Sequence, residues 1–393
     1  MQLAQQPVYV MRGHAAPIHA LHFYRSNSRL VSADADGWAV VWNLATRRPV
    51  AVWKAHDGAV LGVSDWDDCS IVTHGRDNKI YVWQLRLGDE AGLDTELPAA
   101  SQSDRRHPWL LHSLEVNALN FCAFSMCYEI HSGPNSDGPR AIMIAVPSSR
   151  DPNTIDIYHL PSGNRRHVAI GSDLSFKTGM PMALKLLYMG SCLSLIAGYE
   201  SGHAVVFSLD SSAQAWSTIY YSKPHTQPVL SLDSTPGGLS FYTSSADSII
   251  AKHQMPPDDT ATASNTAASP PSLMINTHHA GQQGLVLRSD GKVFATAGWD
   301  SRIRVYSGKT MKEVAVLKWH KEGCYTVAFA RIFDDTGPLP ELSTELCTTT
   351  GNEIVQTNQA TLTVAQLREN RTKKSHILAA GSKDGRVSLW EVF

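Results

Sequence analysis

The 393-residue sequence lacks a surplus of charge of either sign and any long hydrophobic run. Its 34 Lys and Arg side chains nearly balance 36 Asp and Glu side chains, which gives a formal net charge of −2. Nucleic-acid-binding proteins usually carry a basic surplus, so we expect no direct nucleic-acid contact. No stretch of about 18 uninterrupted apolar residues occurs, so we expect no membrane-spanning helix.

The sequence also lacks the signatures of secretion and of disulfide or zinc frameworks. The first residues, MQLAQQPVYVMRGH, hold no basic region followed by an apolar core, so they do not resemble a secretory signal peptide. None of the six cysteines forms a CxxC pair, which favours the reduced thiols of an intracellular protein over a disulfide frame or a metal site. The cysteines are Cys69, Cys122, Cys127, Cys192, Cys324 and Cys347.

A short spacing pattern is present instead, and it recurs five times. A Ser, Thr or Ala is followed four residues later by Asp, and six residues after that by an aromatic residue or His. The five sets are Ser32, Asp36 and Trp42; Thr73, Asp77 and Trp83; Thr243, Asp247 and His253; Thr296, Asp300 and Tyr306; and Ala380, Asp384 and Trp390.

A histidine precedes each Asp of this pattern by a nearly constant distance. His14, His56, His225 and His279 lie 21 or 22 residues before their Asp, whereas His320 lies 64 residues before Asp384 because of an insertion. Runs of period-two alternation follow several histidines, at 18–23, 116–121 (after His112) and 324–329, and they predict strands. The spacing therefore predicts that each unit is a strand, a turn, a strand, an Asp turn and a further strand, with little helix.

These residue types make chemical sense as a structural network. The Asp can accept backbone N–H bonds in its turn. A neutral His can donate to that carboxylate and accept a hydroxyl proton on its other nitrogen, and the hydroxyl oxygen can accept from a Trp indole. Such a satisfied chain of buried polar groups would tie one loop to three strands.

The pattern resembles WD-repeat β-propellers, in which each four-stranded blade carries a His–Ser/Thr–Asp–Trp network. Two units are complete. Three are partial, because the indole is absent at His253 and Tyr306 and the hydroxyl is absent at Ala380. Two further units are degenerate: one begins at His112 and ends at Tyr158, and the other aligns Phe207 with Trp42 and Ser201 with the Asp.

We therefore predict an all-β fold with one seven-bladed propeller over residues 1–393. The last blade has room for only three strands, so we expect an N-terminal strand at 7–12 to complete it and to close the ring. The approximate blade limits are 13–53, 54–111, 112–170, 171–222, 223–277, 278–317 and 318–393 with 7–12. Four insertions interrupt the spacing, and we expect them to be flexible rather than functional: 86–106, 131–140, 256–271 and 331–375.

The recurrent His, Asp and Ser could also suggest a Ser–His–Asp hydrolase. The constellation recurs in unit after unit, whereas a nucleophile is normally needed once, and no G-x-S-x-G elbow occurs. The GQQG at 281–284 is too short for a phosphate-binding loop. His278 and His279 could suggest a metal, but His279 occupies the repeat's histidine position. We expect no enzymatic activity, no cofactor and no metal.

A scaffold of this kind typically presents loops to protein partners, and its sites must be argued residue by residue. The residue before each turn Asp should point from one face of the disc, and a Trp beside Arg and Lys is typical of interaction hot spots. We therefore expect partner contacts at Arg76, Trp299 and Lys383, although Trp299 could equally pack on a neighbouring blade.

Three stretches carry a closer resemblance: 12–23, 295–330 and 378–393. They are similar to the ASTRA-associated protein 1 family of fungi, whose animal relative is a G-protein-β-like propeller. The resemblance implies a non-enzymatic, nuclear subunit, possible also in the cytoplasm, of an assembly that contains the TTT co-chaperone. That co-chaperone matures phosphatidylinositol-3-kinase-related kinases, and the assembly is linked to chromatin remodelling. The expected partners are TTT subunits and other ASTRA components, bound by a monomeric propeller. The alternative is a G-protein-β-like signalling adaptor, against which the absence of a heptad before His14 argues.

Overall fold

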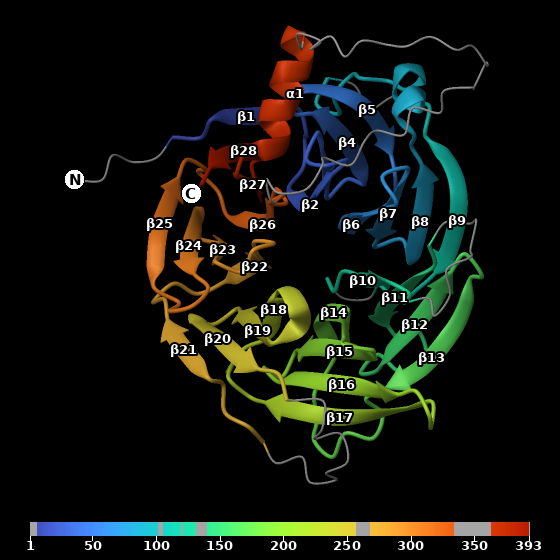
Figure 1. The fold of residues 1–393 in the computed structure, drawn as a ribbon, viewed down its shortest axis with the longest axis vertical. Coiled ribbons are helices and arrows are strands. Elements are labelled where there is room, and N and C mark those ends of the chain that lie inside the picture. Colours follow the sequence, from blue (N-terminus) through green and yellow to red (C-terminus); the bar gives the residue numbers. More distant parts are fainter. Residues whose placement is uncertain are drawn as a thin grey trace, which may run out of the picture.

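The computed structural model describes residues 6–100, 105–118, 121–130, 140–256, 268–333 and 363–392. Within them the strands form seven four-stranded antiparallel sheets. The sheets are arranged around a central axis like the blades of a propeller (Figure 1). The predicted all-β, seven-bladed propeller is confirmed.

The first strand of each blade lies at the central channel and the fourth at the rim. Blades one to three contain β2 (Ile18–Tyr24), β3 (Arg29–Asp34), β4 (Trp38–Asn43), β5 (Arg48–Lys54); β6 (Val60–Trp66), β7 (Ser70–Gly75), β8 (Lys79–Gln84), β9 (Trp109–Glu115); and β10 (Ser125–Tyr128), β11 (Ile142–Pro147), β12 (Ile155–Leu160), β13 (Asn164–Ile170).

The remaining blades repeat this order. Blades four to seven contain β14 (Pro181–Met189), β15 (Cys192–Tyr199), β16 (Ala204–Asp210), β17 (Ala215–Ser222); β18 (Val229–Ser234), β19 (Ser240–Ser245), β20 (Ile249–Gln254), β21 (Leu273–Asn276); β22 (Gln282–Leu287), β23 (Val293–Gly298), β24 (Arg302–Ser307), β25 (Glu313–Lys318); and β26 (Cys324–Phe329), β27 (Ile377–Ser382), β28 (Arg386–Glu391), β1 (Tyr9–Arg12). The described helices are α1 (Val364–Lys374) and the short 3-10 helices η1 (Leu87–Gly92) and η2 (Pro236–Gly238).

Both ends of the chain meet in blade seven, as the sequence predicts. Strand β1 pairs antiparallel with β28, with Tyr9 opposite Leu389 and Arg12 opposite Arg386. Met11 of β1 is buried in one apolar cluster with Ile18 of the first blade. The N-terminal strand thus completes the last sheet and also contacts its neighbour.

The core lies between adjacent blades. Every residue of β3 and of β7 is buried, because a middle strand packs against a blade on each side. Trp53 of blade one and Trp83 of blade two share one such cluster, with ring centroids 6.3 Å apart. The inner strands border the channel and are only partly buried; in β2 a register shift between Ile18 and Ala20 interrupts the alternation that the sequence shows at 18–23.

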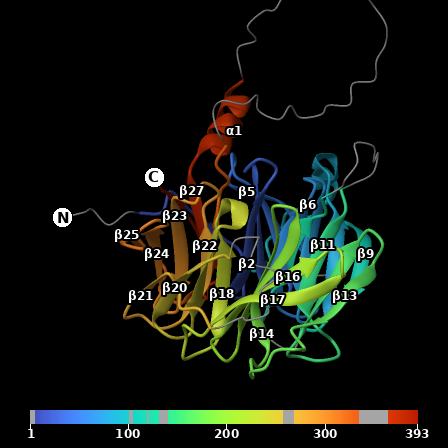
Figure 2. The same ribbon diagram turned by 60° about the horizontal axis from the view of Figure 1, so that its bottom comes forward.

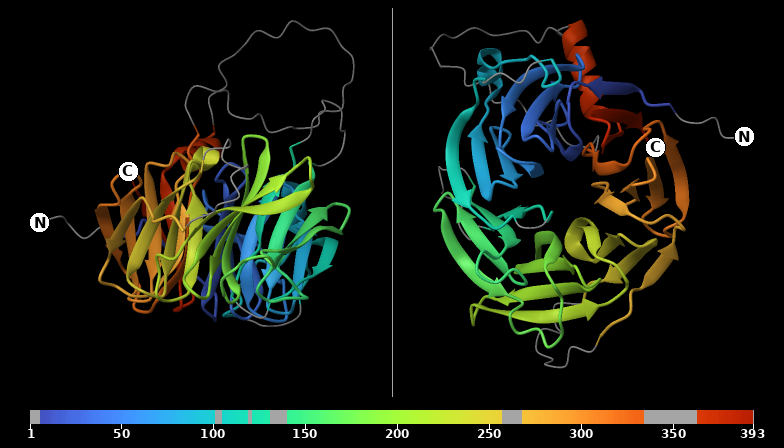
Figure 3. Two further views of the ribbon diagram at one scale, coloured as in Figure 1. Left: turned by 90° about the horizontal axis from the view of Figure 1, so that it is seen from below. Right: turned by 180° about the vertical axis from the view of Figure 1, so that it is seen from behind.

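The two faces of the disc carry different connections between strands. Antiparallel connection places the turns between second and third strands, and the links between blades, on one face, which we call the turn face. The other two turns of each blade lie on the opposite face, which we call the insertion face. Helices α1, η1 and η2 all rise from the insertion face (Figures 2 and 3).

All four predicted insertions interrupt turns of the insertion face. They lie between β8 and β9, β10 and β11, β20 and β21, and β26 and β27. Residues 101–104, 131–139, 257–267 and 334–362 of these insertions lie outside the described residues. The described part of the last insertion includes α1, which Thr363 caps at its N-terminus.

The described part of the 86–106 insertion is packed against blade one. Glu90 of η1 is buried and accepts hydrogen bonds from the guanidinium groups of Arg25 and Arg29, the latter at 2.8 Å. The backbone N–H of Val52 in β5 donates to the carbonyl of Asp94 at 2.8 Å. These contacts hold the described part of the insertion against blade one.

The strand expected at 116–121 is wrong in its described part. Residues 116–118 lie outside any strand, and the inner strand of blade three is β10, which begins at Ser125. His112 belongs to β9, the outer strand of blade two, where its ring lies 5.8 Å from that of Trp66. The alternation after His112 therefore does not mark the start of the third blade.

Candidate functional site

The turn face is built on hydrogen-bond networks, and blade two has the simplest of them. The Nδ1 atom of His56 lies 2.9 Å from Oδ1 of Asp77, and Nε2 lies 2.8 Å from the hydroxyl of Thr73. The indole of Trp83 donates to the same hydroxyl at 2.9 Å. A Cβ atom at Gly75 would lie 2.3 Å from the His56 ring, so glycine leaves room for it.

Blade one uses a different carboxylate from the one predicted. His14 lies 2.7 Å from Ser32 through Nε2, but its Nδ1 lies 2.6 Å from Asp34, whereas Asp36 is exposed. Trp42 donates to Ser32 at 2.8 Å. Asp34 occupies the strand end where blade two has Gly75, so its side chain projects directly at the histidine and takes the place of the turn Asp.

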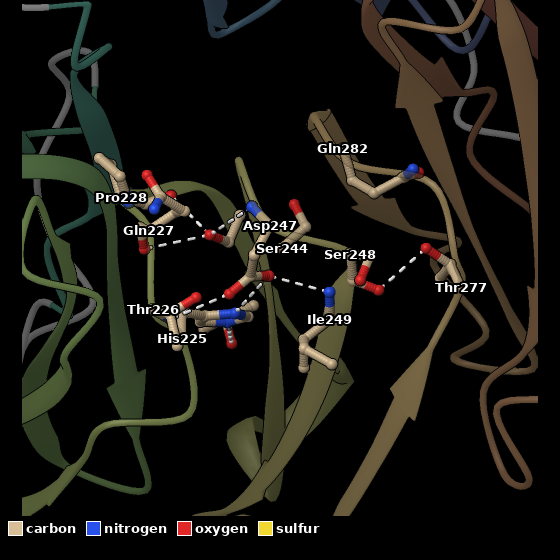
Figure 4. A network of polar contacts seen from close by, with 12 residues as sticks. His225, Thr226, Gln227, Pro228, Ser244, Asp247, Ser248, Ile249, Thr277 and Gln282 are labelled. Atoms are coloured by element: carbon tan, nitrogen blue, oxygen red, sulfur yellow. Dashed lines mark hydrogen bonds and ion pairs between the residues drawn. The ribbon is translucent and has the colours of Figure 1, made fainter.

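Blade five replaces the indole with an imidazole. His225 lies beside Asp247 (Figure 4), at 3.2 Å, and it lies 2.9 Å from the hydroxyl of Thr243. Nε2 of His253 lies 3.1 Å from that hydroxyl, and its Nδ1 lies 2.8 Å from the hydroxyl of Tyr220. Burial, with the nearby His225, lowers the pKa of His253 to about 3, so its ring is neutral and can donate from Nε2.

Blade seven recovers a hydroxyl that its sequence pattern lacks. His320 lies 3.2 Å from Asp384, and its Nε2 lies 2.8 Å from the hydroxyl of Ser388. Trp390 donates to the same hydroxyl at 2.8 Å. The network predicted to be broken at Ala380 is therefore complete, with its hydroxyl on the next strand.

Blade six departs furthest from its predicted network. His279 is about half exposed, and its Nδ1 lies 3.7 Å from Asp300. Thr296 donates instead to the amide oxygen of Gln282 at 2.8 Å, and Asp300 accepts from Arg304 at 2.6 Å. A glutamine three residues after His279 thus fills the histidine's place, and an arginine satisfies the turn carboxylate.

Blade four also departs from the repeat, because its turn position carries Ser201 in place of an Asp. The Ser201 hydroxyl lies 2.7 Å from Nδ1 of His203, whose ring stacks on Phe176 with a centroid distance of 4.7 Å. The hydroxyl and imidazole of this turn are therefore only two residues apart in sequence, and they contact no turn carboxylate among the described residues.

These networks are closed to substrates. The hydroxyls of Ser32, Thr73 and Thr243 are fully buried, and each already contacts a histidine ring. A nucleophile needs space beside its oxygen for the reacting carbonyl. Among the residues that the structure describes, no group of three or more His, Cys, Asp or Glu side chains could hold a metal ion.

The exposed side chains of the turn face gather around the mouth of the central channel. The guanidinium of Arg76 lies 4.5 Å from the ring centroid of Phe121, which is 56% exposed. Phe121, Gln283 and Tyr325 all line the channel, a cavity of about 290 Å³. Sequence reasoning missed Phe121, whose place in an alternating run suggested a strand residue.

Trp299 reaches the same mouth from blade six. Its indole donates to the side chain of Gln283 at 2.6 Å, and its side chain is 47% exposed. The ring lies over Gly281, where a Cβ atom would be 2.1 Å from it. Lys383 is exposed, with its ammonium 4.0 Å from Glu322. Arg76 and Trp299 thus flank the channel mouth from blades two and six, on either side of its axis.

Within the described part of the chain, no helix is long and apolar enough to span a membrane.

The side chains around the channel mouth include two aromatic rings, a guanidinium group and an amide: Phe121, Trp299, Arg76 and Gln283. Arg and aromatic residues of this kind dominate the binding energy of many protein–protein interfaces.

Comparison with known proteins gives one consistent family. A family model described as ASTRA-associated protein 1 matches residues 7–390. The relative from Verticillium alfalfae is 46% identical over 388 residues, which covers 98% of this chain and 93% of the relative. The relative from Penicillium rubens is 46% identical over 438 residues, covering 100% and 98%. That from Schizosaccharomyces pombe is 31% identical over 423 residues, covering 98% and 99%. All three are called ASTRA-associated protein 1.

Proposed function

The chain belongs to the ASTRA-associated protein 1 family, and on that premise we propose that it is a non-enzymatic scaffold subunit of the ASTRA assembly. In this proposal it works with the TTT co-chaperone in the maturation of phosphatidylinositol-3-kinase-related kinases, with a link to chromatin remodelling. It acts in the nucleus as a monomeric propeller within the larger complex. The relatives' shared name, which states association with ASTRA, supports the assembly.

At residue level, the observation that carries the proposal is the set of exposed side chains around the channel mouth. Arg76 and Phe121 form a cation–π pair, and Trp299 is held in place by Gln283 while half of its surface stays exposed. A preorganised aromatic side chain loses little conformational entropy on binding. We therefore place the contact with TTT subunits at Arg76, Trp299 and Lys383, extended by Phe121.

The test is affinity purification of the tagged full chain from its own cells, followed by mass spectrometry. The wild-type protein should recover TTT subunits. The variants Trp299→Ala and Arg76→Ala together should lower that recovery at least tenfold, because truncating a hot-spot residue costs about 2 kcal/mol or more. Circular dichroism and the melting temperature should match those of the wild type.

Trp109→Ala is the matched control. Trp109 is 73% exposed on β9, at the outer rim of blade two. Its loss should leave recovery unchanged. If Trp109→Ala abolishes recovery and the mouth variants do not, the contact lies on the rim and the mouth is not the site. If the wild-type chain recovers no TTT subunit, the proposed assembly itself is wrong.

A further inference from the structure

A groove opens on the insertion face between helix α1 and the strands that close the ring. Helix α1 stands beside β1 and β28 (Figures 1 and 2). The cavity between them measures about 430 Å³. Its walls include Arg368 and Arg371 of α1, Arg47 of the turn after β4, and the apolar side chains of Val8 and Leu389.

The charges of this groove are unbalanced. Among the described residues, the guanidinium groups of Arg368 and Arg371 make no hydrogen bond or ion pair, and that of Arg47 only lies over the ring of Tyr9, 4.9 Å from its centroid. Among the described residues of the lining, Glu391 is the one carboxylate. Three guanidinium groups thus line the groove together with one carboxylate, whereas Arg29 and Arg304 elsewhere each pair with an acid.

The helix holds its two arginines in a fixed place. Arg368 lies three residues before Arg371 and four before Thr372, so all three lie on one side of α1. Together with Ser375, which follows the helix, they line the groove. The amide of Asn27, in the turn between β2 and β3, donates to the carbonyls of Arg331 at 2.7 Å and Lys373 at 3.2 Å. The end of the helix is therefore tied to blade one.

We propose that this groove binds an acidic peptide segment of a partner protein. Planar guanidinium groups bind carboxylates with two parallel hydrogen bonds, and clusters of arginine recognise acidic motifs in this way. The exposed side chain of Val8, together with Leu389, provides an apolar surface for a hydrophobic residue between the acidic ones. Charge complementarity selects this occupant: the groove is a basic patch on a protein whose net charge is −2.

The proposal goes beyond the proposed function and does not depend on it. The groove lies on the insertion face, opposite the channel mouth, and its test needs only the purified chain and a synthetic peptide. Failure of the peptide to bind would leave the assembly with TTT subunits untouched, and loss of TTT recovery by mouth variants would leave the groove untouched.

The probe is a fluorescein-labelled peptide of nine residues that alternates Glu with Leu and Phe, and binding to the full chain is followed by fluorescence anisotropy. A second peptide with Gln in place of every Glu is the matched control. We expect the acidic peptide to bind and its affinity to fall as salt rises, because surface charge pairs are screened. Equal binding of both peptides would show that the arginines contribute nothing and would overturn the proposal.

Two variants test the arginines from separate elements. The double substitution Arg368→Gln and Arg371→Gln should weaken binding about tenfold or more, and Arg47→Gln alone about threefold to tenfold. Arg47→Gln leaves α1 intact, so its effect cannot come from a lost helix. Arg150→Gln, an exposed arginine of the turn face, is the control and should bind like the wild type. Wild-type affinity in the groove variants, or an equal loss in Arg150→Gln, would refute the site.

Discussion

In blade seven, the Nε2 atom of His320 lies 2.8 Å from the hydroxyl of Ser388, one strand away from where blades one, two and five carry the hydroxyl. Ser388 is the direct cross-strand partner of Ala380. Replacing Ser388 with Ala would leave the indole of Trp390 and one nitrogen of His320 buried without a partner. We expect a loss of about 1–3 kcal/mol in the free energy of unfolding, measured by urea titration.

The cross-strand pairing also supplies the control. The double variant Ala380→Ser with Ser388→Ala returns the hydroxyl to β27, where the other blades carry it. It should recover most of the lost stability, since Ala380 is fully buried and faces the same network. A double variant as unstable as Ser388→Ala alone would show that the hydroxyl's position is not interchangeable between the two strands.

A second prediction separates Asp34 from Asp36. Asp34 is fully buried and accepts from His14 and from the backbone N–H groups of Asp36 and Trp38, both at 3.0 Å. Asp34→Ala should therefore lower the free energy of unfolding by about 1–3 kcal/mol or more, since several donors lose one acceptor. Asp36→Ala should change it by less than about 0.5 kcal/mol. Thermal melting of both variants checks this, and a costlier Asp36→Ala would contradict the network described.

The sequence reveals the networks better than it reveals their exact members. The spacing between histidine and Asp follows from a blade's strand lengths, so the repeat and the ring closure could be predicted. Asp34, Ser388 and Gln282 could not, because each lies off the counted position yet reaches the same point in space. A hydrogen bond requires a donor or acceptor at one point in space. A residue on either of two neighbouring strands, or at either of two positions of one strand, can supply that group.

A third prediction concerns acid. Burial, with the nearby His56, lowers the pKa of His74 to about 3, and burial likewise lowers that of His253 to about 3. The unfolded chain takes up a proton on each below its ordinary pKa of 6.5, whereas the folded chain does not. Stability should therefore fall as pH drops from about 6.5 towards 3, by up to about 1.4 kcal/mol per pH unit for each proton.

His253→Trp isolates one of these protons. The Trp supplies the donor that blades one and two use, and it removes the titrating ring. The free energy of unfolding is measured by urea titration at about five pH values between pH 6 and 4.5. Its slope against pH should fall by about 1.4 kcal/mol per pH unit, the contribution of one proton. An unchanged slope would mean that His253 is protonated in the folded state. Both ring nitrogens of His253 would then donate, to Tyr220 and to Thr243, instead of one donating and one accepting.

The aspartates of the turns add a second, more acidic window. Burial raises the pKa of Asp77, but the hydrogen bond and electrostatic interaction with His56 outweigh burial and lower the pKa overall. His225 and His320 lower the pKa of Asp247 and Asp384 in the same way. Their contribution to stability is present above the ordinary carboxyl pKa and is lost as pH falls below about 4. Asp77→Asn should reduce this loss, which unfolding measured between pH 4.5 and 3 would show.

The candidate partner site was less predictable than the fold. Counting one residue back from each turn Asp identified exposed side chains at Arg76, Trp299 and Lys383, because a tight turn exposes that position. It could not find Phe121, which reaches the channel mouth from a link between blades rather than from such a turn. The groove beside α1 could not be predicted from residue spacing either, since it brings together residues near both ends of the chain.

The last prediction tests the docking of the 86–106 insertion on blade one. Glu90 is 9% exposed and pairs with Arg25 and Arg29, which are similarly buried. Glu90→Ala would leave two guanidinium groups without their acid, and removing one partner of a buried pair costs about 3–5 kcal/mol. The chain can reduce that cost by releasing η1 from the blade and letting water reach both arginines. We therefore expect faster trypsin cleavage after Arg86, Arg105 and Arg106, with a smaller drop in melting temperature than unfolding of the blade would give.

Glu96→Ala, at an exposed acid of the same segment, is the control and should be cleaved like the wild type. Unchanged cleavage of Glu90→Ala would show that contacts such as that between Val52 and Asp94 hold the segment without the charge cluster.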